Sequence, residues 1–335
     1  MILSKFRFIP TLSLLSLVVA APVVACDGDD DVEPTPDTND ASMTPITDAA
    51  ADVGVPSRDA EVEAAKDAAG DATDATPLPS TEVRLEFAAK VGSQPFACGS
   101  EYQGVGAPSQ TITPVDLRFY VHDVRVVDAD GNEIPVKLDI NDWQLANVAL
   151  LDFEDGTGEC TNGDVETNSV VFGKVDTPVV VKGIKFKLGV PLELNHGDLA
   201  GQPTPLDRTS MFWAWNAGYI FLRGESGSEL PVEDAGTTVM KVHATHVGSG
   251  GCSGNAVAGE PVVCTRPNRP EFAFAEFDLT TNKIVFDFAA FKSGSDLSGS
   301  SCHGHGASCV APFVALGIDS MTGNYIGNQT VFHKE

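Results

Sequence analysis

The chain has 335 residues and a formal net charge of −26 at pH 7, from 47 acidic and 21 basic residues. This balance repels nucleic acid, and no cluster of Lys and Arg overrides it, so a nucleic-acid-binding protein is excluded. Hydrophobic residues make up 42% of the chain, which is enough to build a sizeable core.

Residues 1–25 have the features of a secretory signal peptide. Lys5 and Arg7 form its positive start, and the apolar run 12–21 is too short to span a bilayer. Small and aliphatic residues then lead directly into Cys26, which is typical of a bacterial lipobox and predicts a lipid on that cysteine. The sequence therefore predicts a lipid-anchored protein of the bacterial cell envelope, periplasmic or surface-exposed. An ordinary signal peptide cut nearby is the alternative.

Residues 26–80 form an acidic segment, with 15 acidic residues against two basic ones and no aromatic residue. Such a composition cannot bury enough apolar surface to offset the entropy lost on ordering. Like charges along the segment also repel one another and extend it. We therefore expect a disordered linker that holds the following domain away from the lipid.

From residue 81 onward, apolar and polar residues alternate in short runs that predict β-strands. Strands are expected at 83–91, 117–126, 134–138, 148–153, 179–181, 184–190, 239–246, 272–277 and 284–288. The apolar phase flips near His122 and Asp123, which predicts a β-bulge, and Asp130-Gly131 predicts a hairpin turn. A short helix is expected within 310–318. The sequence thus predicts one all-β domain over residues 81–335, a β-sandwich or barrel-like fold of short antiparallel strands.

Six of the seven cysteines remain once Cys26 is assigned to the lipid. An even number in an exported chain predicts disulfides, and the absence of a Cys-x-x-Cys pair argues against a zinc knuckle or a redox motif. Short spacing along the chain favours the pairs Cys252–Cys264 and Cys302–Cys309, which leaves Cys98 and Cys160 for each other. Other pairings remain open. The expected pairs are Cys252–Cys264, Cys302–Cys309 and Cys98–Cys160.

An aromatic stretch at residues 211–221 holds two of the three tryptophans, Trp213 and Trp215. Residues i and i+2 of an extended strand point to the same side, so we expect the two indoles to share one face. Two such large rings form either a wall of the core or the lining of a pocket.

Histidines near strand ends are the other candidates for chemistry, because signatures of hydrolases, zinc proteases and nucleotide-binding loops are missing from the sequence. His122 lies at the expected bulge, and His196 lies in the loop before the tryptophans. His243 and His246 flank a strand end and should face opposite sides. Loop-end imidazoles close to an aromatic pair are compatible with a copper or zinc site.

The remaining histidines fit a simpler interpretation. His303 and His305 lie between Cys302 and Cys309, where solvated imidazoles in a short disulfide loop are expected, and a metal at that turn is the alternative. His333 is near the C-terminus and is expected to be exposed.

Several segments occur together, in one order, in a known family. They are 117–125 (LRFYVHDVR), 151–154 (LDFE), 188–191 (LGVP) with Asn195-His196, 211–219 (MFWAWNAGY), and 246–248 (HVG) before Cys252. On these segments the chain resembles the MbnP-like copper-binding proteins, also called the metallo-mystery pair four-cysteine proteins. The resemblance covers most of residues 81–335, includes the tail 302–317, and leaves out the signal and the acidic linker.

The resemblance implies an exported copper-binding protein that is not an enzyme. In this family a partner dihaem cytochrome, similar to bacterial cytochrome c peroxidases, converts a tryptophan into kynurenine. An indole offers no good lone pair to a metal, whereas kynurenine exposes an aniline nitrogen and a carbonyl, and nitrogen donors suit copper. The implied metal-site residues are His196, His246, His122, and Trp213 or Trp215, with Trp143 as a weaker candidate.

A second function is also compatible with the sequence. A disulfide-stapled β-domain on an acidic tether is typical of a surface adhesive or glycan-binding module without a metal. In that case Trp213 and Trp215 would form a platform on which a sugar stacks.

Overall fold

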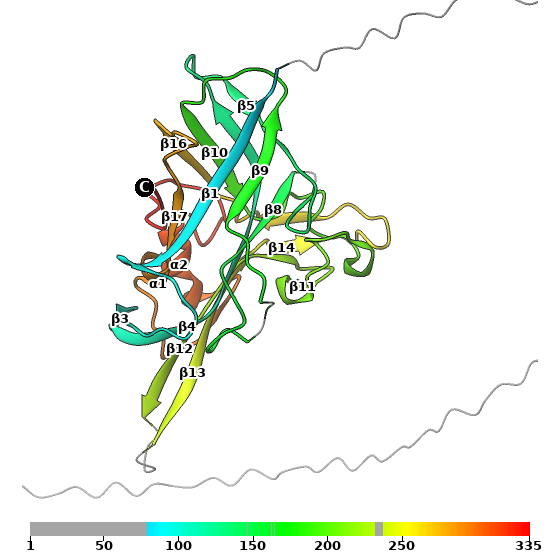
Figure 1. The fold of residues 1–335 in the computed structure, drawn as a ribbon. Coiled ribbons are helices and arrows are strands. Elements are labelled where there is room, and N and C mark those ends of the chain that lie inside the picture. The colour runs from blue at the N-terminus through cyan, green and yellow to red at the C-terminus, as the bar shows by residue number, and fades with distance from the viewer. Residues whose placement is uncertain (1–78, 146, 162, 164, 232–236) are drawn as a thin grey trace, which may run out of the picture. The chain divides into compact units, whose positions relative to one another are not determined.

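A computed structural model describes residues 79–335, apart from residues 146, 162, 164 and 232–236 (Figure 1). The predicted signal peptide, the lipidation site Cys26 and nearly all of the predicted linker lie outside the described residues.

The described residues form two main β-sheets, one of six strands and one of eleven. The six-stranded sheet runs in the order β19 (Phe332–Lys334), β17 (Ile284–Asp287), β1 (Thr81–Val91), β9 (Val170–Val175) and β6 (Lys137–Leu138), with β2 (Gln94–Pro95) beside β1. The main path of the other sheet is β16 (Glu271–Ala275), β10 (Gly183–Leu188), β4 (Gln110–Val127), β12 (Gly218–Pro231), β13 (Thr238–Gly248) and β18 (Cys302–His303). Neither sheet closes on itself within the described residues, so the fold is a sandwich rather than a barrel.

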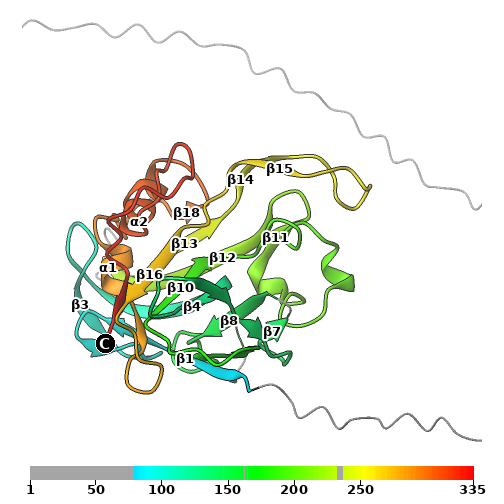
Figure 2. The same ribbon diagram turned by 90° about the horizontal axis from the view of Figure 1, so that it is seen from above.

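Shorter elements extend this framework. Strands beside the main path of the larger sheet are β3 (Tyr102–Val105), β5 (Glu133–Pro135), β7 (Gln144–Leu145), β8 (Val148–Asp152) and β11 (Phe212–Ala214). A separate hairpin consists of β14 (Gly250–Ser253) and β15 (Val263–Arg266). The helical segments are α1 (Phe288–Lys292), α2 (Val310–Ala315), η1 (Leu199–Gly201), η2 (Thr209–Met211) and η3 (Ala307–Cys309). Figure 2 shows β11 across the domain from α1 and α2, and the β14–β15 hairpin along the upper edge between them.

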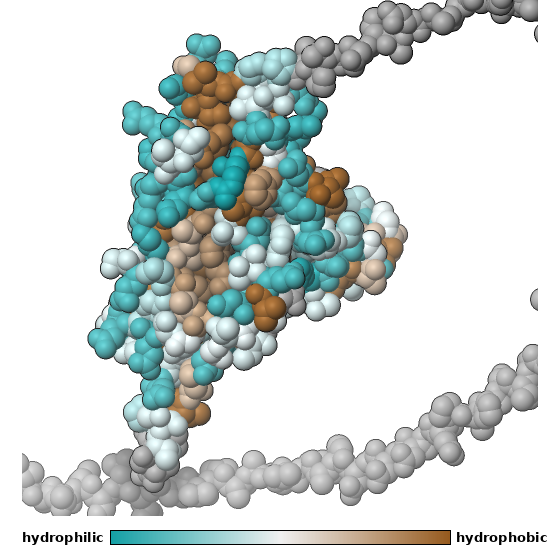
Figure 3. Space-filling model, in the orientation of Figure 1, coloured by the Kyte–Doolittle hydropathy of each residue, from teal (hydrophilic) through white to brown (hydrophobic). Residues whose placement is uncertain are grey.

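The core lies between the facing sides of the two sheets. Phe119 of β4 stacks on Phe286 of β17 with ring centroids 5.3 Å apart, and Phe87 of β1 meets Phe186 of β10 edge-on at 5.5 Å. All four side chains are buried, as the alternation of apolar residues in their strands predicts. Truncating one such ring to alanine costs about 3–5 kcal/mol. The outer surface, in the view of Figure 3, is mostly polar with separate apolar patches.

The predicted strands and the predicted bulge are confirmed, with one exception. Asp123 has a φ of 51°, and the pairing of β10 with β4 shifts register between Lys185 and Lys187, opposite this point. Residues 179–181, however, are not a strand. The Val179 amide donates to the Thr81 hydroxyl instead of to a neighbouring strand, and β10 begins only at Gly183.

The aromatic stretch is a hairpin and not the single strand that the alternation predicts. β11 ends at Ala214, the Ala217 amide donates to the Ala214 carbonyl, and Gly218 begins β12 with a φ of 82°. Trp213 therefore lies on a strand, whereas Trp215 lies in the turn. The signal for this turn is Gly218, since a positive φ favours glycine.

All three predicted disulfides are present. They are Cys98–Cys160, Cys252–Cys264 and Cys302–Cys309, with Cα–Cα distances of 5.7, 3.9 and 4.8 Å. Among the described residues, no helix is both long enough and apolar enough to cross a membrane.

Candidate metal site

Trp213 lies at the centre of the candidate site, and two glycines make room for its ring. A Cβ at Gly248 of β13 would lie 2.5 Å from Cζ3 of the indole, and a Cβ at Gly304 would lie 2.9 Å from Cη2. Any larger residue at either position would push the ring away. Trp215, by contrast, is 41% exposed and projects from the turn.

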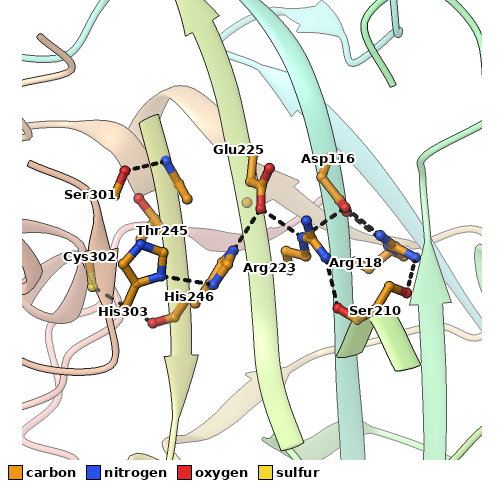
Figure 4. Close-up of polar contacts among 12 residues, drawn as sticks. Asp116, Arg118, Ser210, Arg223, Glu225, Thr245, His246, Ser301, Cys302 and His303 are labelled. Carbon is orange, nitrogen blue, oxygen red and sulfur yellow. Dashed lines mark hydrogen bonds and ion pairs between the residues drawn. The ribbon is translucent and has the colours of Figure 1, made fainter. Parts of the chain in front are cut away.

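Two histidines meet beside this indole. β18 pairs in parallel with β13, and the register places His303 opposite His246. Their Nδ1 atoms lie 3.2 Å apart (Figure 4), and the His246 ring centroid is 6.4 Å from that of Trp213. His303 was expected to be a solvated loop residue; it is exposed, but its ring faces His246.

The two Nδ1 atoms share a hydrogen bond in the metal-free protein, and their separation also fits one metal ion that would replace the shared proton and be held by both rings. Two nitrogens that each bind a tetrahedral metal at about 2.0–2.1 Å lie roughly 3.3 Å apart. Burial, and to a smaller extent the neighbouring His246, lower the pKa of His303. This shift favours the neutral imidazole, which is the form that can bind a metal.

Glu225 of β12 fixes the tautomer of His246. The carboxylate can only accept, so the Nε2–H of His246 donates to Glu225 Oε1 at 2.7 Å, and this leaves the Nδ1 lone pair directed toward His303. Burial alone would raise the pKa of Glu225. The hydrogen bond from His246 and the charge of Arg223, at 2.7 Å, outweigh burial and lower this pKa to about 2.

A ladder of buried charges continues from Glu225 across the sheet to the base of the aromatic hairpin. Arg223 lies 3.1 Å from Asp116 of β4, which also binds Arg118 (Figure 4). Arg223 donates to the Ser210 carbonyl at 2.8 Å, and Arg118 donates to the Ser210 hydroxyl at 2.9 Å. Because Ser210 lies three residues before Trp213, the ladder connects the His246 ring to the segment that carries the indole.

Comparison with known proteins identifies the family. The MbnP family model matches residues 80–307. The chain belongs to the MbnP family. Among solved structures, MbnP from Methylosinus trichosporium shares 28% sequence identity with this chain and superimposes on it with a TM-score of 0.66. The match covers 77% of this chain and 99% of the Methylosinus chain. No curated protein sequence matches the chain significantly. The resemblance inferred from the sequence motifs is thereby confirmed.

His196 of this MbnP-family domain lies in a second cluster, beside a disulfide. Its Nδ1–H donates to the Trp215 carbonyl at 3.0 Å, and its Nε2 accepts from the Asn195 amide at 2.9 Å. The same Nε2 is 3.3 Å from Cys264 Sγ, and all three donor atoms of His196, Cys252 and Cys264 lie within 4.8 Å of one another. The two sulfurs are bonded to each other, however, so this cluster offers a metal no thiolate.

The other predicted candidates have different neighbours. His122 is buried, and its Nδ1–H donates to the Gly189 carbonyl at 2.7 Å; burial lowers its pKa to about 4. His243 is buried against Lys292, and Trp143 packs under the guanidinium of Arg208, as expected for structural residues. The structure thus brings Trp213 and His246 together and adds His303, which the sequence analysis placed in solvent.

A hollow of about 400 Å³ opens beside Trp213 and His303. Its walls come from the aromatic hairpin, from β14 and β15, and from the Cys302–Cys309 loop. The lining residues are Trp213, Asn216, Ala217, Ser249, Gly250, Gly251, Cys252, Arg266, His303, Gly304 and His305. Trp213 and His303 are therefore reachable from the hollow.

Proposed function

We propose that this protein binds one copper ion through the Nδ1 atoms of His246 and His303, with Trp213 as a third ligand after its oxidation to kynurenine. The observation that carries the proposal is the 3.2 Å separation of these two atoms beside the Trp213 ring. Membership of the MbnP family supports copper as the metal.

The chemistry of the donor set is compatible with this metal. Neutral imidazoles bind copper in both of its common oxidation states, and an aniline nitrogen from kynurenine would complete a nitrogen-rich set. Glu225 would act as the carboxylate partner that orients a metal-bound histidine, an arrangement that usually raises ligand basicity.

Of the two tryptophans in the hairpin, Trp213 is the better candidate for oxidation. Its ring is seated on Gly248 and Gly304, next to His246, and it lines the hollow. Conversion to kynurenine cleaves the C2–C3 bond of the indole by oxygen insertion, and hydrolysis then releases C2 as formate. The side chain thus loses one carbon atom and gains one oxygen atom, as the ketone at C3. We propose that a partner dihaem protein similar to cytochrome c peroxidase carries out this oxidation, so that the chain is a substrate and not an enzyme.

His196 and His122 receive supporting roles in this proposal. His196 holds the carbonyl of Trp215 in the turn of the hairpin, and His122 holds the carbonyl of Gly189 at the bulge of β4. We further propose that the mature protein starts at a lipidated Cys26 and that residues 26–80 tether the copper domain to a bacterial membrane, in the periplasm or at the cell surface.

The glycan-binding alternative depends on two indoles on one face of a strand. Trp215 lies in the turn after β11, and Trp213 packs against glycines of other segments. The sugar platform that motivated this alternative is therefore lost, and we put forward no second function.

The test is to produce the full chain with and without its dihaem partner. When the partner is present, peptide mapping of residues 209–223 should locate the carbon-for-oxygen exchange at Trp213, and the protein should contain close to one copper per chain. Without the partner, both signals should be absent. Trp213→Phe should lose both signals, whereas Trp215→Phe, the matched control in the same hairpin, should keep both. An unmodified Trp213 in a protein that binds copper fully would rule out kynurenine as a ligand.

A further inference from the structure

The hollow beside the candidate copper site has an unusual balance of charge for this protein. The chain as a whole carries 47 acidic residues, yet none of the residues that line the hollow is Asp or Glu. The ionisable groups that line it are Arg266, His303 and His305. A metal ion bound there would add further positive charge, so the hollow favours an anion.

Arg266 is held in the hollow by the geometry of the β14–β15 hairpin. It lies opposite Gly250 in the register, and a Cβ at Gly250 would lie 2.8 Å from its Nε and 3.2 Å from its Nη2. The guanidinium therefore occupies the space that a side chain at position 250 would take. Glycine at this position allows Arg266 to lie along the wall.

No hydrogen-bond acceptor within the described residues satisfies Nε of Arg266, although this atom is buried. Arg118 and Arg125 bind the carboxylates of Asp116 and Glu271, and Arg269 donates to the carbonyls of Val190 and Pro267. No ion pair of this kind involves Arg266 in the part of the chain that the structure describes. Nε faces Gly250 and is closed off from the hollow, so a ligand would reach the two Nη atoms of Arg266, which also have no acceptor among the described residues.

We infer that Arg266 anchors a second subsite of the hollow, which binds a small carboxylate beside the copper ion. This inference rests on the proposed copper function. A guanidinium presents two parallel N–H groups that match the two oxygens of a carboxylate, and this match selects carboxylates over spherical anions. A copper ion held by His246 and His303 would add positive charge beside this subsite.

The size of the hollow limits the ligand. About 400 Å³ is far more than the roughly 30 Å³ that one water molecule occupies, so the hollow can hold an organic acid of several heavy atoms. The aromatic ring at position 213, as an indole or as kynurenine, offers such a ligand an apolar face. The ligand class is thus a small mono- or dicarboxylate.

The experiment titrates oxalate into the copper-loaded protein and into the metal-free protein, with acetate and chloride as comparison anions. Calorimetry follows binding in both forms. Tryptophan fluorescence follows it in the metal-free protein made without the dihaem partner, and the visible spectrum follows it in the copper form. We expect oxalate to bind more tightly than acetate, and chloride not to compete. Arg266→Gln should weaken oxalate binding roughly tenfold or more without changing the copper stoichiometry.

The matched control is Arg84→Gln, which removes the same charge from an exposed arginine that pairs with Glu86. It should bind oxalate as the unaltered protein does. Equal oxalate affinity in Arg266→Gln, or displacement of oxalate by chloride at equal concentration, overturns the subsite. If copper fails to bind but the metal-free protein binds oxalate in an Arg266-dependent way, the copper proposal is wrong and the anion subsite stands.

Discussion

The Nδ1 atoms of His246 and His303 lie 3.2 Å apart, although 57 residues separate them in the chain. Two features bring them together: the parallel pairing of β18 with β13, and the Cys302–Cys309 disulfide that closes the loop carrying His303. Cys302 is fully buried, so the strand that presents His303 is fixed even though the imidazole itself is exposed.

His303→Ala should abolish tight copper binding and leave the fold intact. The imidazole is exposed and packs against few groups, so the metal-free protein should unfold at nearly the same temperature. Copper affinity, measured by competition with a chelator, should fall by more than the roughly 10–100-fold that the loss of an outer-shell partner costs. His333→Ala removes another exposed imidazole, on β19, and should change neither property. Unchanged affinity in His303→Ala would exclude His303 as a ligand.

Gly248→Ala should displace the indole of Trp213. The added Cβ would lie 2.5 Å from Cζ3 and 2.8 Å from the Tyr219 carbonyl oxygen, so both the ring and the hairpin that carries it must move. We expect a shifted tryptophan emission, weaker copper binding and a loss of about 1–3 kcal/mol of stability from overpacking. Gly201→Ala is the matched control, because nothing lies within 4 Å of a Cβ at that position. A copper affinity equal to that of Gly201→Ala would mean that the position of the indole is irrelevant to the metal.

Glu225→Gln should weaken copper binding by about 10–100-fold, as expected when the group that orients a ligand histidine is changed. An amide can donate as well as accept, so it no longer fixes the proton on Nε2 of His246. Nitrogen NMR of the imidazole should then show a mixture of tautomers, which a purely structural effect would not produce. Glu229→Gln makes the same change on the same strand and should leave the His246 tautomer as it is.

Much of the fold follows from local patterns in the sequence. The alternation of β1, the phase flip at the bulge of β4 and the short cysteine spacings each depend on neighbouring residues, and each prediction is confirmed. The two local failures have physical causes. Residues 179–181 make a hydrogen bond to the Thr81 side chain rather than to a strand, and Gly218 breaks the aromatic stretch into a hairpin.

The candidate site was only partly predictable. Trp213 and His246 stand in recognisable motifs, and the structure places their rings 6.4 Å apart. His303 was missed because its contact with His246 arises from pairing between segments far apart in the sequence, and local spacing carries no information about such pairing. The contact of Glu225 with His246 also joins segments far apart in the sequence. Carboxylates are abundant in this acidic chain, so the sequence does not single out Glu225.

Lys292 should make the stability of the domain depend on pH in the alkaline range. Its Nζ is fully buried and donates to the Gly224 carbonyl and the Thr245 hydroxyl at 2.9 Å, and to the His243 carbonyl at 3.2 Å. None of these partners is a carboxylate. Burial lowers the pKa of Lys292 to about 7, and the more distant charge of Glu225 opposes this only in part.

The sign follows from proton linkage. Above pH 7 the folded chain has lost the Lys292 proton, whereas the unfolded chain keeps it up to about pH 10.4. Between these pH values the unfolded chain binds more protons, so the free energy of unfolding should rise by up to about 1.4 kcal/mol per pH unit. Urea unfolding at pH 7.5 and 9 measures this slope. Lys292→Met should flatten it, and Lys283→Met, at an exposed position, should not. A stability of the unaltered protein that stays constant between pH 7.5 and 9 would mean that Lys292 remains charged in the folded state, held by the oxygen atoms around its Nζ.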